Sequence, residues 1–130
     1  MSRRLQMLQV ARLARRTLGD AAELVVSFRR SLEAPGGGYC DRGGRPDLYY
    51  TSFALDALVA LDALPIATGP AESLRSYLES FGAGDRLDFV HRCCLARAWA
   101  SQPPAAVADT RRDALLAGVE RHREIGRAHV

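Results

Sequence analysis

Three side chains with metal-binding chemistry recur at every third position late in the sequence. Asp88, His91 and Cys94 are all residue types that bind zinc, and Cys40 could approach them from a glycine-rich loop. A spacing of i, i+3 and i+6 drifts around a helix, however, and a single histidine beside buried cysteines is more often structural. We therefore predict no metal site and no cofactor, and name Asp88, His91 and Cys94 as the residues at which a metal would have to bind.

Other patterns of catalytic chemistry are missing from the sequence. The glycine-rich segment 34–46 contains neither a Gly-Lys-Ser nor a GxGxxG phosphate-binding motif. No Ser-His-Asp arrangement and no pair of catalytic carboxylates stands out. The three cysteines are too few for a disulfide scaffold and fit reduced, buried thiols. The residue pattern by itself therefore assigns no catalytic residue.

Apolar periodicity predicts an all-α protein of about six helices. The expected helices cover residues 1–18, 20–32, 47–61, 70–81, 87–101 and 104–121. The second, fourth and sixth have one apolar stripe, whereas the third and fifth are apolar around most of their circumference. A helix of the second kind must be enclosed by its neighbours, so we predict that helices 47–61 and 87–101 are walled in on most sides.

The first two helices carry apolar stripes, and the later helices repeat a hairpin plan. The stripes consist of Met7, Val10, Ala11, Ala14 and Leu18 in the first helix and of Ala21, Leu24, Val25, Phe28 and Leu32 in the second. An offset of 40 residues sets Leu55 over Leu95 and aligns the third helix with the fifth. Stacked helical hairpins bury such faces against neighbouring units. Because the last hairpin would lack a neighbour, we expect the isolated chain to be marginally stable, oligomeric or aggregating.

Charge and hydropathy limit the classes of partner. The net charge of +3 comes from the first helix, where five arginines precede Asp20, leaving 13 of the 18 basic residues to balance 15 acids. Such a start could bind an anionic surface, but it is more often a solvated face, and we predict no nucleic-acid partner. No stretch approaches the roughly 18 apolar residues of a membrane span, and the start lacks a secretory signal. We therefore predict a cytoplasmic protein. The absence of lysine is typical of a GC-rich bacterial genome.

The end of the sequence resembles a translated sequencing adapter. Residues 125–130, Ile-Gly-Arg-Ala-His-Val, match one reading frame of a common short-read adapter up to its stop. A segment of this kind carries no information about the native fold. We therefore expect residues 1–123 to form a single hairpin-repeat domain, the N-terminal part of a longer protein, and residues 124–130 to be a non-native tail.

Residues 35–61, PGGGYCDRGGRPDLYYTSFALDALVAL, resemble the repeat of the prenyltransferase and squalene oxidase (squalene-cyclase) family. The matching residues, in the order of that repeat, are Gly37, Gly38, Tyr39, Gly44, Asp47, Tyr50, Thr51 and Leu55. Residues 74–99 are similar but lack most of the glycine loop. The resemblance implies a partial α/α toroid, with helices 47–61 and 87–101 in the inner ring around a central cavity.

The resemblance also implies an isoprenoid ligand in an aromatic-lined cavity. Tyr39, Asp47, Tyr49, Tyr50 and Phe89 lie near the starts of the proposed inner helices and are its candidate lining residues. The family's zinc-binding Asp-x-Cys motif is absent here, since the matching position reads Asp-Leu-Tyr, and the cyclases' Asp-x-Asp-Asp acid is absent too. Zinc binding is therefore expected, if at all, only in a longer form of the protein.

The sequence is consistent with two hypotheses about function. The first is a prenyltransferase-like protein that binds an isoprenoid, of which this chain is an inactive part. The second is a non-catalytic helical-repeat scaffold that binds a protein partner or a further copy of itself. Loss of the Asp-x-Cys motif favours the second hypothesis.

Overall fold

A computed structural model describes residues 3–61, 70–103 and 107–128 and confirms the all-α prediction. Its six helices are α1 (Arg3–Leu18), α2 (Ala21–Ser31), α3 (Leu48–Ala60), α4 (Pro70–Glu79), α5 (Phe89–Ala100) and α6 (Asp109–Ala128). Within the described segments, β-structure is confined to the isolated bridges Glu33–Tyr39 and Cys40–Pro46. Among the same residues, no helix combines the length and the hydropathy of a membrane span. Helix α6 continues across residue 123, the domain boundary that the sequence suggested.

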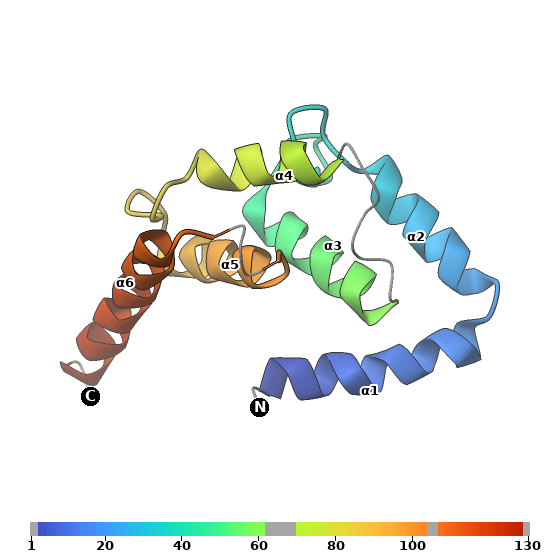
Figure 1. The fold of residues 1–130 in the computed structure, drawn as a ribbon, viewed down its shortest axis with the longest axis horizontal. Coiled ribbons are helices and arrows are strands. Elements are labelled where there is room, and N and C mark those ends of the chain that lie inside the picture. Colours follow the sequence, from blue (N-terminus) through green and yellow to red (C-terminus); the bar gives the residue numbers. More distant parts are fainter. Residues whose placement is uncertain (1–2, 62–69, 104–106, 129–130) are drawn as a thin grey trace.

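The helices α3 and α5 lie side by side at the centre of the molecule. Figure 1 shows α1, α2, α4 and α6 arranged around this pair, with α1 along the free side of α3 and α6 beside α5. Leu55 and Leu58 of α3 and Leu95 of α5 are fully buried in one hydrophobic cluster. On α3 only Tyr49 and Phe53 are exposed. On α5 the side chains of residues 89–90 are about half exposed. The prediction that these two helices are enclosed on most sides is therefore confirmed, apart from an open stripe on α3 and the start of α5.

Both central helices begin at an aspartate. The Asp47 carboxylate accepts a hydrogen bond from the Tyr50 backbone N–H at 3.1 Å, and the Asp88 carboxylate accepts one from the His91 backbone N–H at 2.8 Å. Each aspartate satisfies a donor that the first helical turn leaves unpaired. The helices α3 and α5 thus begin with the same kind of N-cap.

The glycine-rich loop before α3 packs its backbone directly against α4. Gly37 and Gly38 have φ values of +95° and +77°, which favour glycine. A Cβ atom on Gly37 would lie 2.0 Å from the Ser73 carbonyl oxygen, and one on Gly38 would lie 2.6 Å from the Tyr77 ring. The two glycines are therefore required both by their conformation and by the close approach of α4.

The first hairpin differs from the expected arrangement. Met7, Val10 and Leu13 of α1 are 66%, 68% and 65% exposed, and Leu24 and Phe28 of α2 are 73% and 59% exposed. Among the residues that the structure describes, these large apolar side chains of α1 and α2 therefore stay open and are not buried against a neighbouring unit. The reason is that α1 packs on α3 through its arginine-rich edge, while α2 buries only two small side chains, Ala22 and Val26.

Candidate functional site

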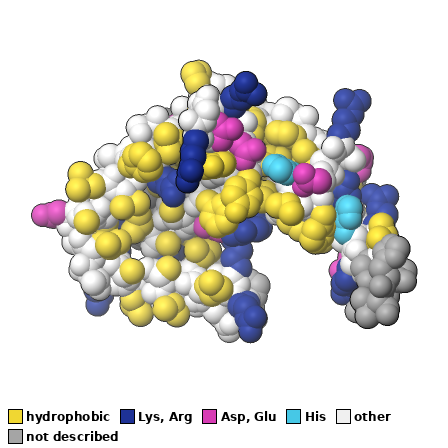
Figure 2. Space-filling view, turned by 180° about the vertical axis from the view of Figure 1, so that it is seen from behind, with side chains coloured by type: hydrophobic (Ala, Val, Ile, Leu, Met, Phe, Trp, Pro, Cys, Tyr) yellow, Lys and Arg dark blue, Asp and Glu magenta, His cyan; other side chains and the backbone are white. Residues whose placement is uncertain are grey.

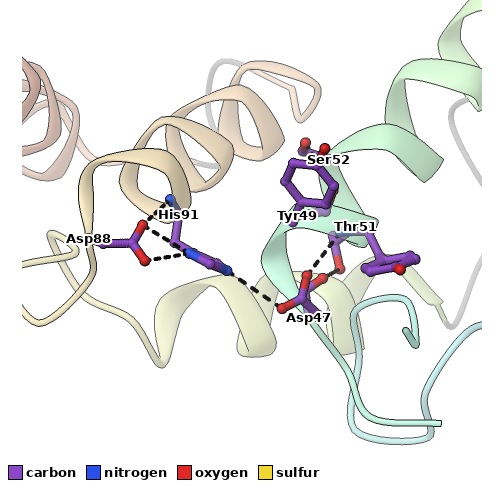
Figure 3. Close-up of polar contacts among 7 residues, drawn as sticks. Asp47, Tyr49, Thr51, Ser52, Asp88 and His91 are labelled. Carbon is purple, nitrogen blue, oxygen red and sulfur yellow. Dashed lines mark hydrogen bonds and ion pairs between the residues drawn. The ribbon is translucent and has the colours of Figure 1, made fainter. Parts of the chain in front are cut away.

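A histidine bridges the N-termini of the two central helices. His91 Nδ1 lies 2.9 Å from both carboxylate oxygens of Asp88, and His91 Nε2 lies 3.6 Å from an Asp47 carboxylate oxygen. Figure 3 shows the imidazole between the two carboxylates, with Tyr49 alongside on the first turn of α3. The local i, i+3 spacing brings Asp88 to His91, whereas Asp47 reaches it only through the packing of α3 against α5.

The two carboxylates favour a positively charged imidazole. The hydrogen bond to Asp88 raises the pKa of His91 and outweighs the lowering effect of partial burial, and the negative charges of Asp88 and Asp47 add smaller raising contributions. Hydrogen bonds from His91, first from its backbone N–H and then from its ring, lower the pKa of Asp88. A protonated ring can donate to both carboxylates at once. The cluster therefore acts as an electrostatic link between α3 and α5.

The hydroxyl groups near this histidine are engaged by backbone. Thr51 Oγ1 donates to the Asp47 carbonyl at 2.7 Å and accepts from the Tyr39 N–H at 2.9 Å. Ser52 Oγ donates to the Tyr49 carbonyl at 3.3 Å. Both side chains are buried. Neither hydroxyl is hydrogen-bonded to His91, so the described residues around the histidine do not form an activated nucleophile.

The three candidate metal ligands are not brought together. Asp88 and His91 are in contact, but Cys94 is 4% exposed and belongs to the hydrophobic core. Among the residues that the structure describes, no group of three histidine, cysteine or acidic side chains is arranged to hold a metal ion. Burial raises the pKa of the neighbouring Cys93 thiol, which disfavours the thiolate that metals bind.

The five candidate cavity residues separate into two groups. Tyr39 is buried, its hydroxyl donates to Glu33 at 3.0 Å, and burial raises its pKa well above the usual range. Asp47 caps α3, and Tyr50 is half-buried. Only Tyr49 and Phe89 are exposed, on α3 and α5. Tyr39 thus serves the core, and the two exposed aromatics remain as candidate surface residues.

Tyr49 extends into an aromatic strip that residue spacing alone did not predict. Its ring centroid lies 4.9 Å from that of Phe53 in an edge-to-face arrangement, and the Arg97 guanidinium lies 5.6 Å from the Phe53 centroid. The face drawn in Figure 2 gathers hydrophobic side chains in its middle, beside acidic and histidine side chains and bordered by arginines. A strip of this kind can hold an apolar or cationic group against its rings.

A second polar cluster, at Asp56, was also missed. Its carboxylate forms ion pairs with Arg4 of α1, at 2.6 Å, and with Arg97 of α5. The partners are 52 and 41 residues away in sequence, so no local spacing reveals them. The available signal is Asp56 itself, because a lone charge within an apolar, enclosed helix needs a partner.

Comparisons of the chain with models of protein families, with curated proteins and with solved structures found no match.

Proposed function

We propose that this chain is a non-catalytic helical-hairpin scaffold that binds a helical protein partner. The binding surface is the first-hairpin face, which we define as Met7, Val10, Leu13, Leu24 and Phe28. Each of these side chains is more than half exposed, on two helices that contact each other. Exposed apolar side chains on two adjacent helices commonly mark an interaction surface. Their exposure is the observation that carries the proposal.

Charge indicates what kind of helix would fit this surface. The helices α1 and α2 contain seven arginines and one acid, Glu23, which already pairs with Arg15 at 3.2 Å. A second copy of the chain would bring like charges together across the interface. Arg4 and Arg15 are already engaged at α3 and its end. Three other arginines are exposed, namely Arg3, Arg16 and Arg30. An amphipathic helix with an apolar stripe and acidic flanks complements both the apolar side chains and these exposed arginines. The proposed partner is therefore an acidic amphipathic helix.

Two synthetic peptides test this proposal. Both carry the same leucine stripe in a helical sequence, one with glutamate flanks and the other with lysine flanks, and their binding to the full chain is followed by fluorescence anisotropy. We expect the acidic peptide to bind and the basic peptide to bind at least about tenfold more weakly. We also expect the double variant Leu24→Asp and Phe28→Asp to lose binding, whereas Leu116→Asp, on α6, retains it.

Two results would count against the scaffold proposal. One is equal binding of the acidic peptide to the Leu24→Asp and Phe28→Asp variant and to the unmodified chain. The other is absence of peptide binding together with tight binding to vesicles of anionic lipid, since a basic, apolar helix pair also suits a membrane surface. The second result would reassign the first-hairpin face to lipid.

The aromatic strip supports a second candidate, isoprenoid binding. Tyr49 and Phe53 are each 45% exposed and lie on a helix whose other residues are buried or half-buried. Phe89, on α5, is also exposed, and its ring centroid lies 5.1 Å from that of His122 on α6. Isoprenoid chains pack well on aromatic faces, and the proposed kinship with the prenyltransferase and squalene oxidase repeats points to the same ligand class.

Farnesol tests this second candidate without the contribution of a diphosphate. We expect farnesol to raise the melting temperature of the full chain, and Phe53→Ala to remove that increase. Phe28→Ala is the matched control, because it removes an exposed phenylalanine from a different face. An identical farnesol response in both variants would exclude the aromatic strip as the binding surface.

A further inference from the structure

The arginine pair at Asp56 carries more positive charge than its partner neutralises. Arg4 and Arg97 both direct a terminal guanidinium nitrogen at the one carboxylate of Asp56, and the same Arg4 nitrogen also donates to Ser101 Oγ at 3.0 Å. Three helices, α1, α3 and α5, thus contribute to one polar cluster. Two cations converge on one anion, so a further anion would be attracted to it.

The hydrogen-bonding capacity of the two guanidiniums is also incompletely used. The Nε atoms of Arg4 and Arg97 are shielded from solvent and have no hydrogen-bond partner among the residues that the structure describes. The Asp56 side chain is only 16% exposed, so the cluster is partly removed from water. Shielded guanidinium N–H groups without acceptors are costly. An incoming oxyanion would supply acceptors that the described residues do not.

A hollow of about 320 Å³ adjoins this cluster. Its lining consists of Arg3, Arg4, Met7, Leu8, Asp56 and Arg97. Three guanidiniums and one carboxylate give the lining a net positive charge, and Met7 and Leu8 provide an apolar side. Guanidinium forks match phosphate oxygens in geometry and charge. The hollow thus offers an anion site next to a place for a small apolar group.

We propose that this hollow binds a phosphate-type oxyanion, with the phosphate between Arg4 and Arg97 and an apolar ester group against Met7 and Leu8. Asp56 lies between the two arginines and competes with the ligand for their N–H groups. The site does not rest on the scaffold proposal, since its charged groups lie on α3, α5 and the α3-facing edge of α1, although Met7 belongs to both surfaces.

Isothermal titration of the full chain at constant ionic strength tests the site. Sodium phosphate and butyl phosphate are the soluble ligands, and vesicles of phosphatidylcholine with phosphatidic acid present the same chemistry as a lipid headgroup. We expect butyl phosphate to bind more tightly than phosphate, and Arg97→Gln to weaken both about tenfold through loss of one charged donor set. Arg86→Gln, an exposed arginine in the loop before α5, should leave both affinities unchanged.

A variant with the opposite expected effect protects the test against misfolding. Asp56→Asn removes the competing carboxylate, and we expect it to tighten phosphate binding severalfold. Phosphate binding in either the soluble or the vesicle titration that depends on Arg97 supports the site and identifies its source. Equal affinities for Arg97→Gln, Arg86→Gln and the unmodified chain, or weakened binding in Asp56→Asn, would overturn the proposal.

Discussion

The first hairpin and the central pair of helices differ in where their apolar side chains lie. In α3 and α5 most apolar side chains are buried or half-buried, and Leu55 and Leu95 are inaccessible to solvent. In α1 and α2 the apolar stripes face outward, and arginines of α1 make the polar contacts to α3. An apolar stripe therefore indicates that a helix face favours burial, but it does not identify the element that buries it.

The largest expected effect concerns the loop that closes the enclosed region. Gly37→Ala should lower the free energy of unfolding by about 4 kcal/mol, because the new Cβ would collide with the α4 backbone at a positive φ. Gly36→Ala is the matched control, since a Cβ atom at that position would meet nothing within 4 Å, and it should change stability by less than about 1 kcal/mol. Urea denaturation followed by circular dichroism measures both. Similar losses of unfolding free energy in Gly37→Ala and Gly36→Ala would mean that the loop does not pack against α4.

Core truncation compares the two regions directly. Leu55→Ala should cost about 3 kcal/mol, because it opens a cavity between α3 and α5. Leu24→Ala removes the same atoms from the first-hairpin face and should cost less than about 0.5 kcal/mol in the monomer. The same denaturation experiment applies. A loss of more than about 2 kcal/mol for Leu24→Ala would place that side chain in a core and erase the difference between the regions.

The smallest effect concerns the histidine link. Because the pKa of His91 is raised by folding, its contribution is fully present below its unfolded value of 6.5 and is lost as the pH rises through the folded value. The pKa of Asp88 is lowered by folding, so the contribution of this carboxylate is fully present above its unfolded value of 3.8. It is lost as the pH falls through the lower folded pKa. His91→Ala should therefore cost about 0.5 kcal/mol near pH 5.5, given solvent screening, and nothing near pH 9. A pH-independent cost measured by urea denaturation would contradict an electrostatic link.

Local sequence rules predicted the helices and much of the central pair. Asp47 and Asp88 stand where caps are expected, and the all-round apolar character of residues 48–60 matches a helix that is mostly covered. Gly37 and Gly38, in the glycine-rich loop that the sequence marks at residues 34–46, adopt positive φ. These features depend on neighbours in sequence or on burial alone, and both are readable from residue types.

The remaining features depend on the relative placement of helices. The approach of Asp47 to His91 and the convergence of Arg4 and Arg97 on Asp56 join residues 41 to 52 positions apart. The orientation of α1 was not predicted because its arginines were assigned to solvent, whereas Arg4 and Arg15 contact α3 and the end of that helix. Long arginine side chains can make an interface while an apolar stripe stays open, and periodicity alone does not distinguish the two edges.

Hydroxyl-radical footprinting of the full chain, at a concentration where light scattering finds a monomer, tests the contrast between the two regions most directly. We expect rapid oxidation of Met7 and Phe28 on the first-hairpin face and little oxidation of Trp99, which is 3% exposed although indole is intrinsically reactive. Protection of Met7 and Phe28 in the monomer, or rapid oxidation of Trp99, would contradict an open first hairpin beside an enclosed central pair.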